Sequence, residues 1–171
     1  MKSNIVFLFF IIVFSCCSKK TTSANNISQK VNICANNGTC TFEIIKNKSM
    51  VINADFGKTN YTLIDDFDKN VVKYQYAKDL EKSNIDGGYR EEIVFEIDVE
   101  KSDISLQNSD LQQTKMLFGR YCNCRGQTGL YKVVNGSLDL KNQDDVSFDL
   151  DFKITDVPQV TNNVVVTNGK L

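Results

Sequence analysis

The stretch VSFDLDFKI, residues 146–154, alternates strictly between apolar and polar side chains. Its apolar members are Phe148, Leu150, Phe152 and Ile154, and the residues between them are Ser147, Asp149, Asp151 and Lys153. Successive side chains of a β-strand point to opposite faces of the sheet, so this pattern predicts a strand with one buried face and one solvent face. A strand of this kind belongs to a sheet that covers a hydrophobic core.

The same period of two recurs along most of the chain from residue 31 onward. In YREEIVFEIDVE, residues 89–100, it places Ile93, Phe95, Ile97 and Val99 on the buried face. Further strands are expected in the segments CTFEII, SMVINAD, KTNYTLI, NVVKYQYA, LYKVV and VTNNVVVT. About nine strands with turn signals every ~8–12 residues predict an all-β fold, an antiparallel β-sandwich or a barrel.

Several short segments are expected to connect these strands. KNKS at residues 46–49 and KNQDD at residues 141–145 predict turns between antiparallel neighbours. The pair Asn135-Gly136 lies between apolar alternations, which is the strongest short signal for a hairpin. Pro158, the one proline of the chain, is expected to separate the last two strands.

One segment, NSDLQQTKMLFGRYC at residues 108–122, does not follow the period of two at its start. Ser109 is expected to cap a short helix that reaches Met116, because serine is a preferred N-cap residue. A strand then runs into Cys122. The predicted fold therefore contains one short helix.

The N-terminus, MKSNIVFLFFIIVFSCCSKK, has a lysine at position 2 and an unbroken apolar run over residues 5–14. A charged start followed by a short apolar core predicts a secretory signal, and ten residues are too few for a membrane span, which needs about 20. The following VFSC, residues 13–16, resembles the lipobox of bacterial lipoproteins. This resemblance implies cleavage after Ser15 and a lipid on Cys16.

These boundaries divide the chain into a signal at residues 1–15, a polar, flexible tether at residues 16–30 and one β-domain at residues 31–171. Acyl chains on Cys16 would anchor the protein to a membrane of the cell envelope, on its periplasmic or its surface face. A eukaryotic secreted protein is the alternative origin, because the chain contains five Asn-X-Ser/Thr triplets, at Asn26, Asn37, Asn47, Asn60 and Asn135.

Composition excludes several functional classes. The chain has no histidine, which removes Ser-His-Asp and Cys-His catalytic arrangements and the commonest metal ligand. Its formal net charge of −1 gives no basic field for a nucleic acid, so no nucleic-acid partner is expected. The remaining expectation is a non-catalytic protein.

The four cysteines of the predicted domain are Cys34, Cys40, Cys122 and Cys124, and an even set outside the cytoplasm predicts two disulfides. Local pairing would close CANNGTC, residues 34–40, through a turn. A disulfide across this short loop would stabilise the fold by about 2 kcal/mol. It would also join Cys122 to Cys124, whose Cα atoms in an extended strand lie near the upper limit of about 7 Å. Crossed pairing would close loops of about 90 residues, and each disulfide would then stabilise the fold by about 4.5 kcal/mol. We favour crossed pairing.

A zinc site would use the same four sulfur atoms. Such sites usually have about two to four residues between the cysteines of each half. The chain has five residues between Cys34 and Cys40 and one between Cys122 and Cys124. We therefore expect neither a metal ion nor another cofactor.

The stretch RYCNCRGQTG, residues 120–129, is the candidate ligand loop. Gly126 and Gly129 predict a turn with positive φ angles, and Arg120 and Arg125 flank the cysteines, where they would lower a thiol pKa. The acidic run DDFDKN, residues 65–70, has carboxylates that suit calcium weakly, but a solvated loop is the simpler interpretation.

Together these features predict a lipid-anchored protein of the bacterial cell envelope that binds or scaffolds a partner protein or small ligand. One alternative is an envelope enzyme that uses Cys122 and Cys124 for thiol redox chemistry or clustered carboxylates for hydrolysis. Another is a lipocalin-like carrier with a ligand inside a β-barrel.

Overall fold

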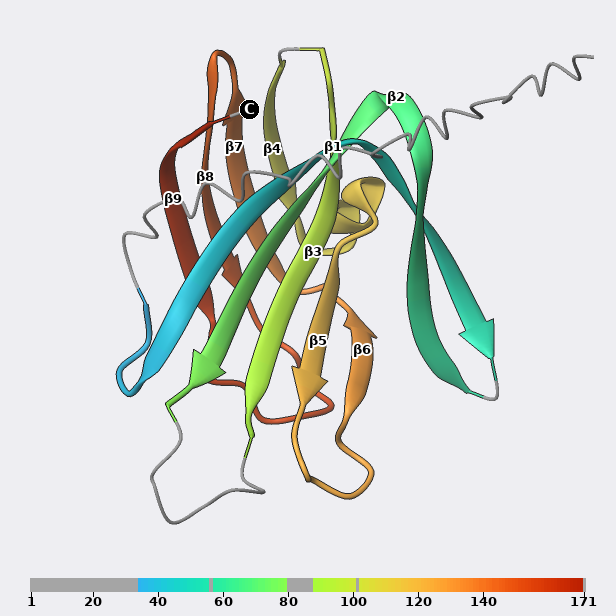
Figure 1. The fold of residues 1–171 in the computed structure, drawn as a ribbon, viewed down its shortest axis with the longest axis vertical. Coiled ribbons are helices and arrows are strands. Elements are labelled where there is room, and N and C mark those ends of the chain that lie inside the picture. The colour runs from blue at the N-terminus through green and yellow to red at the C-terminus, as the bar shows by residue number, and fades with distance from the viewer. Residues whose placement is uncertain (1–33, 56, 80–87, 101, 171) are drawn as a thin grey trace, which may run out of the picture.

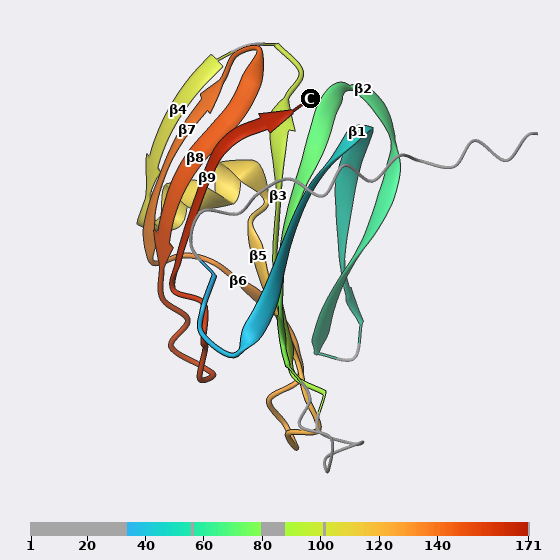
Figure 2. The same cartoon turned by 60° about the vertical axis from the view of Figure 1, so that its left-hand side comes forward.

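A computed structural model describes residues 34–55, 57–79, 88–100 and 102–170. The fold is all-β, as predicted, and its two antiparallel sheets face each other in layers (Figures 1 and 2). The elements in chain order are β1 (Gly38–Asp55), β2 (Lys58–Lys78), β3 (Arg90–Asp98), β4 (Ser102–Gln107), η1 (Asn108–Thr114), β5 (Leu117–Tyr121), β6 (Gly129–Lys132), β7 (Gly136–Asn142), β8 (Asp145–Phe152) and β9 (Asn163–Lys170). The predicted signal, Cys16 and the tether lie outside the described residues.

The five-stranded sheet has the order β1-β2-β3-β5-β6, and the four-stranded sheet has the order β4-β7-β8-β9. The short 3-10 helix η1 lies between the layers at one edge (Figure 2). Ser109 lies inside η1 and does not cap it, since the N-cap residue is Gln107. The predicted strand after the helix is present as β5 and ends one residue before Cys122.

The core lies between the two sheets, and the opening stretch forms β8 as predicted. Phe148, Leu150 and Phe152 are buried, and Ile154 is buried just beyond the strand. Phe148 meets Phe95 of β3 edge to face, with ring centroids 5.5 Å apart. Such a pair adds about 0.5–1.5 kcal/mol to the free energy gained by burying the rings. The period of two therefore identified the face of β8 that holds the sandwich together.

The first two strands form a bent hairpin longer than the sequence indicated. The predicted turn at residues 46–49 is wrong, because β1 continues through these residues with a bulge at Asn47. Asn47 has a φ of 55°, and its backbone N–H donates to the side chain of Asn70 at 3.0 Å. Asparagine tolerates this left-handed conformation, so the strand bends where a turn was expected.

Beyond the bulge, residues 48–55 and 58–65 form a two-stranded arm that folds over the outer face of the five-stranded sheet (Figure 2). Met50 of the arm is buried in a small second core with Val71, Val94 and Leu117. Near the tip, Thr59 pairs with Leu130 of β6, which closes this part into a small barrel. Each buried aliphatic side chain contributes about 1.5–3 kcal/mol.

The arm explains why β3 is buried on both faces. Ile93, Phe95 and Ile97 face the main core, as predicted. Glu92 and Glu96, on the other face, are covered by the arm instead of facing solvent. Val99 was expected on the buried face, but it lies beyond the end of β3 and is exposed.

The hairpin predicted at Asn135-Gly136 is wrong. The chain passes there from β6 in one sheet to β7 in the other. Gly136 has a φ of 141°, and a Cβ atom at this position would lie 2.1 Å from the carbonyl oxygen of Asp151. A glycine is thus needed here so that the backbone of β7 can lie close to the backbone of β8. The turn predicted at residues 141–145 and the break at Pro158 are both confirmed.

Candidate functional site

The disulfides are Cys34–Cys40 and Cys122–Cys124, so the favoured crossed pairing is wrong. The left-handed Asn37 turns the chain back and brings the Cα atoms of Cys34 and Cys40 to 5.7 Å. Cys122 and Cys124 were considered in an extended strand, where their separation would be near the limit. The chain instead bends after Tyr121, which brings their Cα atoms to 5.1 Å.

The turn before β1 and the turn between β5 and β6 lie at the same end of the sandwich (Figure 1). These turns carry Cys34–Cys40 and Cys122–Cys124, so we call this the disulfide end. The described part of the chain begins there with Cys34, whereas β9 ends at the opposite end. Backbone hydrogen bonds join the segments at this end: Asp79 donates to Asn37, and Lys78 donates to Tyr89, each at 2.9 Å. These bonds hold together the turn before β1, the end of β2 and the residue before β3.

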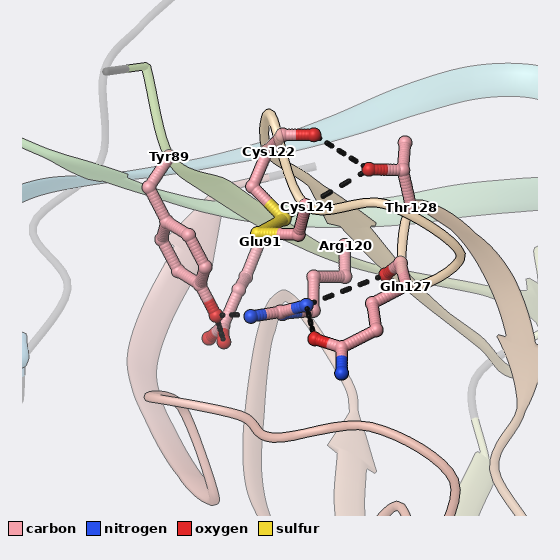
Figure 3. Close-up of a disulfide and its surroundings, with 7 residues drawn as sticks. All are labelled: Tyr89, Glu91, Arg120, Cys122, Cys124, Gln127 and Thr128. Atoms are coloured by element: carbon pink, nitrogen blue, oxygen red, sulfur yellow. Dashed lines mark hydrogen bonds between the residues drawn. A yellow bond between two sulfur atoms is a disulfide. The ribbon is translucent and has the colours of Figure 1, made fainter.

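Arg120 of β5 is the central side chain of this region (Figure 3). It is 7% exposed, although it carries a charge. Its Nε donates to the hydroxyl oxygen of Tyr89 at 3.3 Å, and its Nη1 donates to Oε1 of Gln127 at 2.8 Å. The guanidinium carbon lies 5.3 Å from the centroid of the Tyr89 ring, within the range of a cation–π contact.

Glu91 of β3 lies directly opposite Arg120 in the antiparallel ladder and is fully buried. Its carboxylate accepts hydrogen bonds from the hydroxyl of Tyr89 and from the backbone N–H groups of Val160 and Thr161, the latter two at 2.6 and 2.7 Å. These three donors satisfy a buried charge that would otherwise be costly. They also fix the segment before β9 against β3.

Tyr89 connects the two charged groups, since its hydroxyl donates to Glu91 and accepts from Arg120 (Figure 3). Burial, with the hydrogen bond to Glu91 as a further cause, raises the pKa of Tyr89 to about 12. The hydroxyl group therefore keeps its proton at neutral pH. Arg120, Tyr89 and Glu91 form a fixed polar relay beneath the Cys122–Cys124 disulfide.

A cavity of about 430 Å³ opens beside this relay. Its lining includes Lys78, Tyr89, Arg120, both cysteines of the second disulfide, Pro158 and Val160. Cavities that bind small molecules usually measure about 300–1,000 Å³ and combine apolar walls with a few fixed polar groups. This one has both.

The structure brings together only part of the predicted ligand loop. Arg120, Cys122 and Cys124 line the cavity, whereas Arg125, Gly126 and Gly129 are not among the residues that line it. Gly126 and Gly129 do have positive φ angles, of 75° and 153°, so the predicted turn is confirmed. The turn is closed by Thr128, whose hydroxyl donates to the carbonyl oxygen of Cys122 at 2.6 Å.

Tyr89, Glu91 and Lys78 were not among the predicted site residues. Residues 89–92 were predicted only as the start of a strand. The available signal was the parity of Glu91, which falls on the same face as the buried Ile93 and Phe95. A carboxylate on an inward face needs buried partners, and this was a reason to look for them.

A second depression, of about 450 Å³, crosses the four-stranded sheet and has Asp103, Asp139, Lys141 and Asp149 on its lining. Among the described residues, no cluster of Cys, Asp or Glu has an arrangement suited to a metal ion. The acidic residues 65–68 belong to β2 rather than to a separate loop. The depression holds no fixed buried charge comparable with Arg120.

No helix in the described ranges combines the length and the apolar character needed to cross a membrane. Comparison with protein-family models, with curated proteins and with solved structures gave no match. The geometry of the disulfide end is therefore the basis for assigning a function.

Proposed function

We propose that this chain is an exported, lipid-anchored protein of the bacterial cell envelope whose β-domain binds a ligand at its disulfide end without catalysing a reaction. The lipobox-like VFSC at residues 13–16 supports the anchor. Disulfides are typical of proteins in an oxidising compartment, so the two disulfides of the domain support export.

The cavity beside Arg120 is the observation that carries the binding role. Its lining comes from the end of β2, the residues just before β3, β5 with the Cys122–Cys124 turn, and the segment before β9. The backbone bond from Lys78 to Tyr89 and the hydrogen bonds of Tyr89, Arg120 and Glu91 join these segments. A site held by rigid elements loses little conformational entropy when a ligand binds. The chain also has no histidine to serve as a general base.

Thiol–disulfide exchange at Cys122–Cys124 is the second candidate function. This pair is partly exposed at the rim of the cavity, where a thiolate of another molecule would reach it. A lipocalin-like carrier has less support, because aromatic rings such as Phe42, Phe95 and Phe148 occupy the space between the sheets.

The anchor is tested by metabolic labelling with palmitate. Label is expected on the unaltered protein and lost in the Cys16→Ser variant. A Cys17→Ser variant is the matched control and should keep its label. Label that persists in Cys16→Ser would exclude the proposed anchor.

The binding role is tested by a fragment screen on the purified exported protein, followed by backbone-amide NMR. Fragments are expected to shift the amide signals of Gly88, Asn123 and Val160, which line the cavity. Fragments that shift signals only on the four-stranded sheet would contradict the proposal.

Titration with a dithiol reductant tests the second candidate function, thiol–disulfide exchange. Selective reduction of Cys122–Cys124 favours exchange, and equal resistance of both disulfides favours a structural role.

A further inference from the structure

We infer that the cavity at the disulfide end binds a small organic anion, whose carboxylate or phosphate head is held by Arg120 and Lys78. The inference rests on the proposed binding function and specifies its ligand class. Its basis is the balance of hydrogen bonds and charge around Arg120.

Arg120 has donors that the relay does not use. The guanidinium group carries five N–H donors, and the described residues accept from Nε and Nη1. Nη2 makes no hydrogen bond to any described residue. In the part of the chain that the structure describes, the buried side-chain atoms without a partner are Asn142 Oδ1 and Thr161 Oγ1, so Nη2 is open to solvent where Arg120 lines the cavity. A ligand acceptor in the cavity would therefore find Nη2 accessible.

The charge of Arg120 is also not matched by a direct ion pair. None of the ion pairs among the described residues involves its guanidinium group. Glu91 is the nearest acidic neighbour in the ladder, but its carboxylate is bound by Tyr89, Val160 and Thr161. The hydroxyl of Tyr89 lies between the two charges, so a cation is left facing the cavity.

Lys78, the last residue of β2, supplies a second cation to the lining. Arginine binds an oxyanion through paired N–H groups, and lysine adds a point charge. The other lining residues are uncharged and include Tyr89, Pro158, Val160, both cysteines, Asn123 and Gln159. A compact ligand with one anionic head and an apolar body fits this lining.

Benzoate and benzamide test the inference, because they have nearly the same shape and differ in charge. Each is titrated into the purified exported protein while the amide signals of Gly88, Asn123 and Val160 are followed by NMR. Benzoate is expected to bind at least about tenfold more tightly, since hydrogen bonds to a charged acceptor are about twice as strong as neutral ones. Phenyl phosphate should bind at the same place.

Lys78→Gln is the main variant, because Lys78 is exposed and its replacement leaves the core intact. We expect a several-fold weaker affinity for benzoate and an unchanged affinity for benzamide. Lys141→Gln, an exposed strand lysine of the other sheet, is the matched control and should change neither. Arg120→Lys keeps the charge but loses the paired donors, and we expect at least a tenfold loss for benzoate.

The outcomes separate this inference from the proposed function. Equal binding of benzoate and benzamide in the cavity would overturn the anion assignment and leave the binding function standing. Benzoate binding that Lys78→Gln does not weaken would overturn it as well, even if Arg120→Lys fails to fold. If no fragment of any charge occupies the cavity, the proposed function itself fails.

Discussion

Glu91 and Arg120 occupy directly opposite positions on β3 and β5, and the hydroxyl of Tyr89 bridges their side chains. In a direct buried ion pair, the carboxylate of Glu91 would neutralise the charge of Arg120. The intervening hydroxyl instead lets the carboxylate bind the backbone before β9 while the guanidinium faces the cavity. One oxygen atom thus links the stability of this end to its proposed binding role.

Removing that oxygen is the first test. Tyr89→Phe leaves Nε of Arg120 without its acceptor and Glu91 with one donor fewer. Unpaired buried groups cost about 1–3 kcal/mol, and we expect a loss in this range in urea unfolding. Tyr131→Phe, a half-buried tyrosine against the same core, is the control and should lose clearly less. Equal losses for the two variants would show that the bridge does not stabilise the fold.

The arm is expected to open when its polar contact is removed. Glu96 accepts from the hydroxyl of Ser49 at 2.7 Å, from the backbone N–H of Met50, and from Lys115. Glu96→Ala should lower the free energy of opening by about 2 kcal/mol, because the first two donors are then buried without an acceptor. Hydrogen exchange should accelerate in residues 48–65 and not in β8. Glu43→Ala, which removes a weak ion pair with Lys73, should leave exchange in the arm unchanged.

Two glycines should respond differently to the same substitution. Gly136→Ala places a methyl group against the carbonyl oxygen of Asp151, so β7 and β8 must shift. We expect a loss above about 2 kcal/mol from overpacking and backbone strain. In Gly126→Ala, the new methyl group meets no atom within 4 Å. The strain of its positive φ alone should lower the stability of the fold, by about 1–2 kcal/mol. Thermal unfolding of both variants would test this order, and the reverse order would contradict the close approach.

The pairing of the cysteines has a direct chemical test. Trypsin is expected to release residues 31–46, which contain Cys34 and Cys40, and residues 121–125, which contain Cys122 and Cys124. With the observed pairing, each non-reduced peptide is lighter than its reduced form by two hydrogen atoms and remains a single chain. Mass spectrometry that finds the two peptides joined would restore the crossed arrangement.

Tyr74 and Tyr89 are two of the tyrosines that should make the stability of the fold decrease in alkali. Burial is the main cause that raises the pKa of Tyr74 and of Tyr89 to about 12. Their unfolded pKa is about 10, so the folded protein holds these protons more tightly. The resulting stability is fully present below about pH 10 and is lost as the pH rises toward about 12. Urea unfolding across this range should show a flatter decline in a Tyr74→Phe, Tyr89→Phe double variant.

The period of two was sufficient to predict the strands that touch solvent on one face. It identified Phe148, Leu150 and Phe152 as core residues, because in such a strand the apolar side chains face the core and the polar ones face solvent. It failed for Glu92 and Glu96, because the cover over them is the arm, a distant part of the chain. At Asn47, the residues that make a bulge are the residues that favour a turn, so local sequence does not distinguish the two.

The candidate site was predictable only in its residue types. Cysteines near Arg120 drew attention to residues 120–129, but the relay depends on which residues lie opposite one another across β3 and β5. The disulfide partners depended on a bend after Tyr121, which is held by contacts of Gln127 and Thr128. Neither register nor bend is encoded in spacing alone.

Because each cysteine of the domain is joined to the next one along the chain, the protein has a simple route through oxidation. A chain that emerges from its N-terminal side presents Cys34 and Cys40 together, well before Cys122 and Cys124. Within the described domain, the native partner of each cysteine is its neighbour in the sequence. Neither disulfide closes a large loop in the unfolded chain, so each one restricts only a few residues before the sheets assemble.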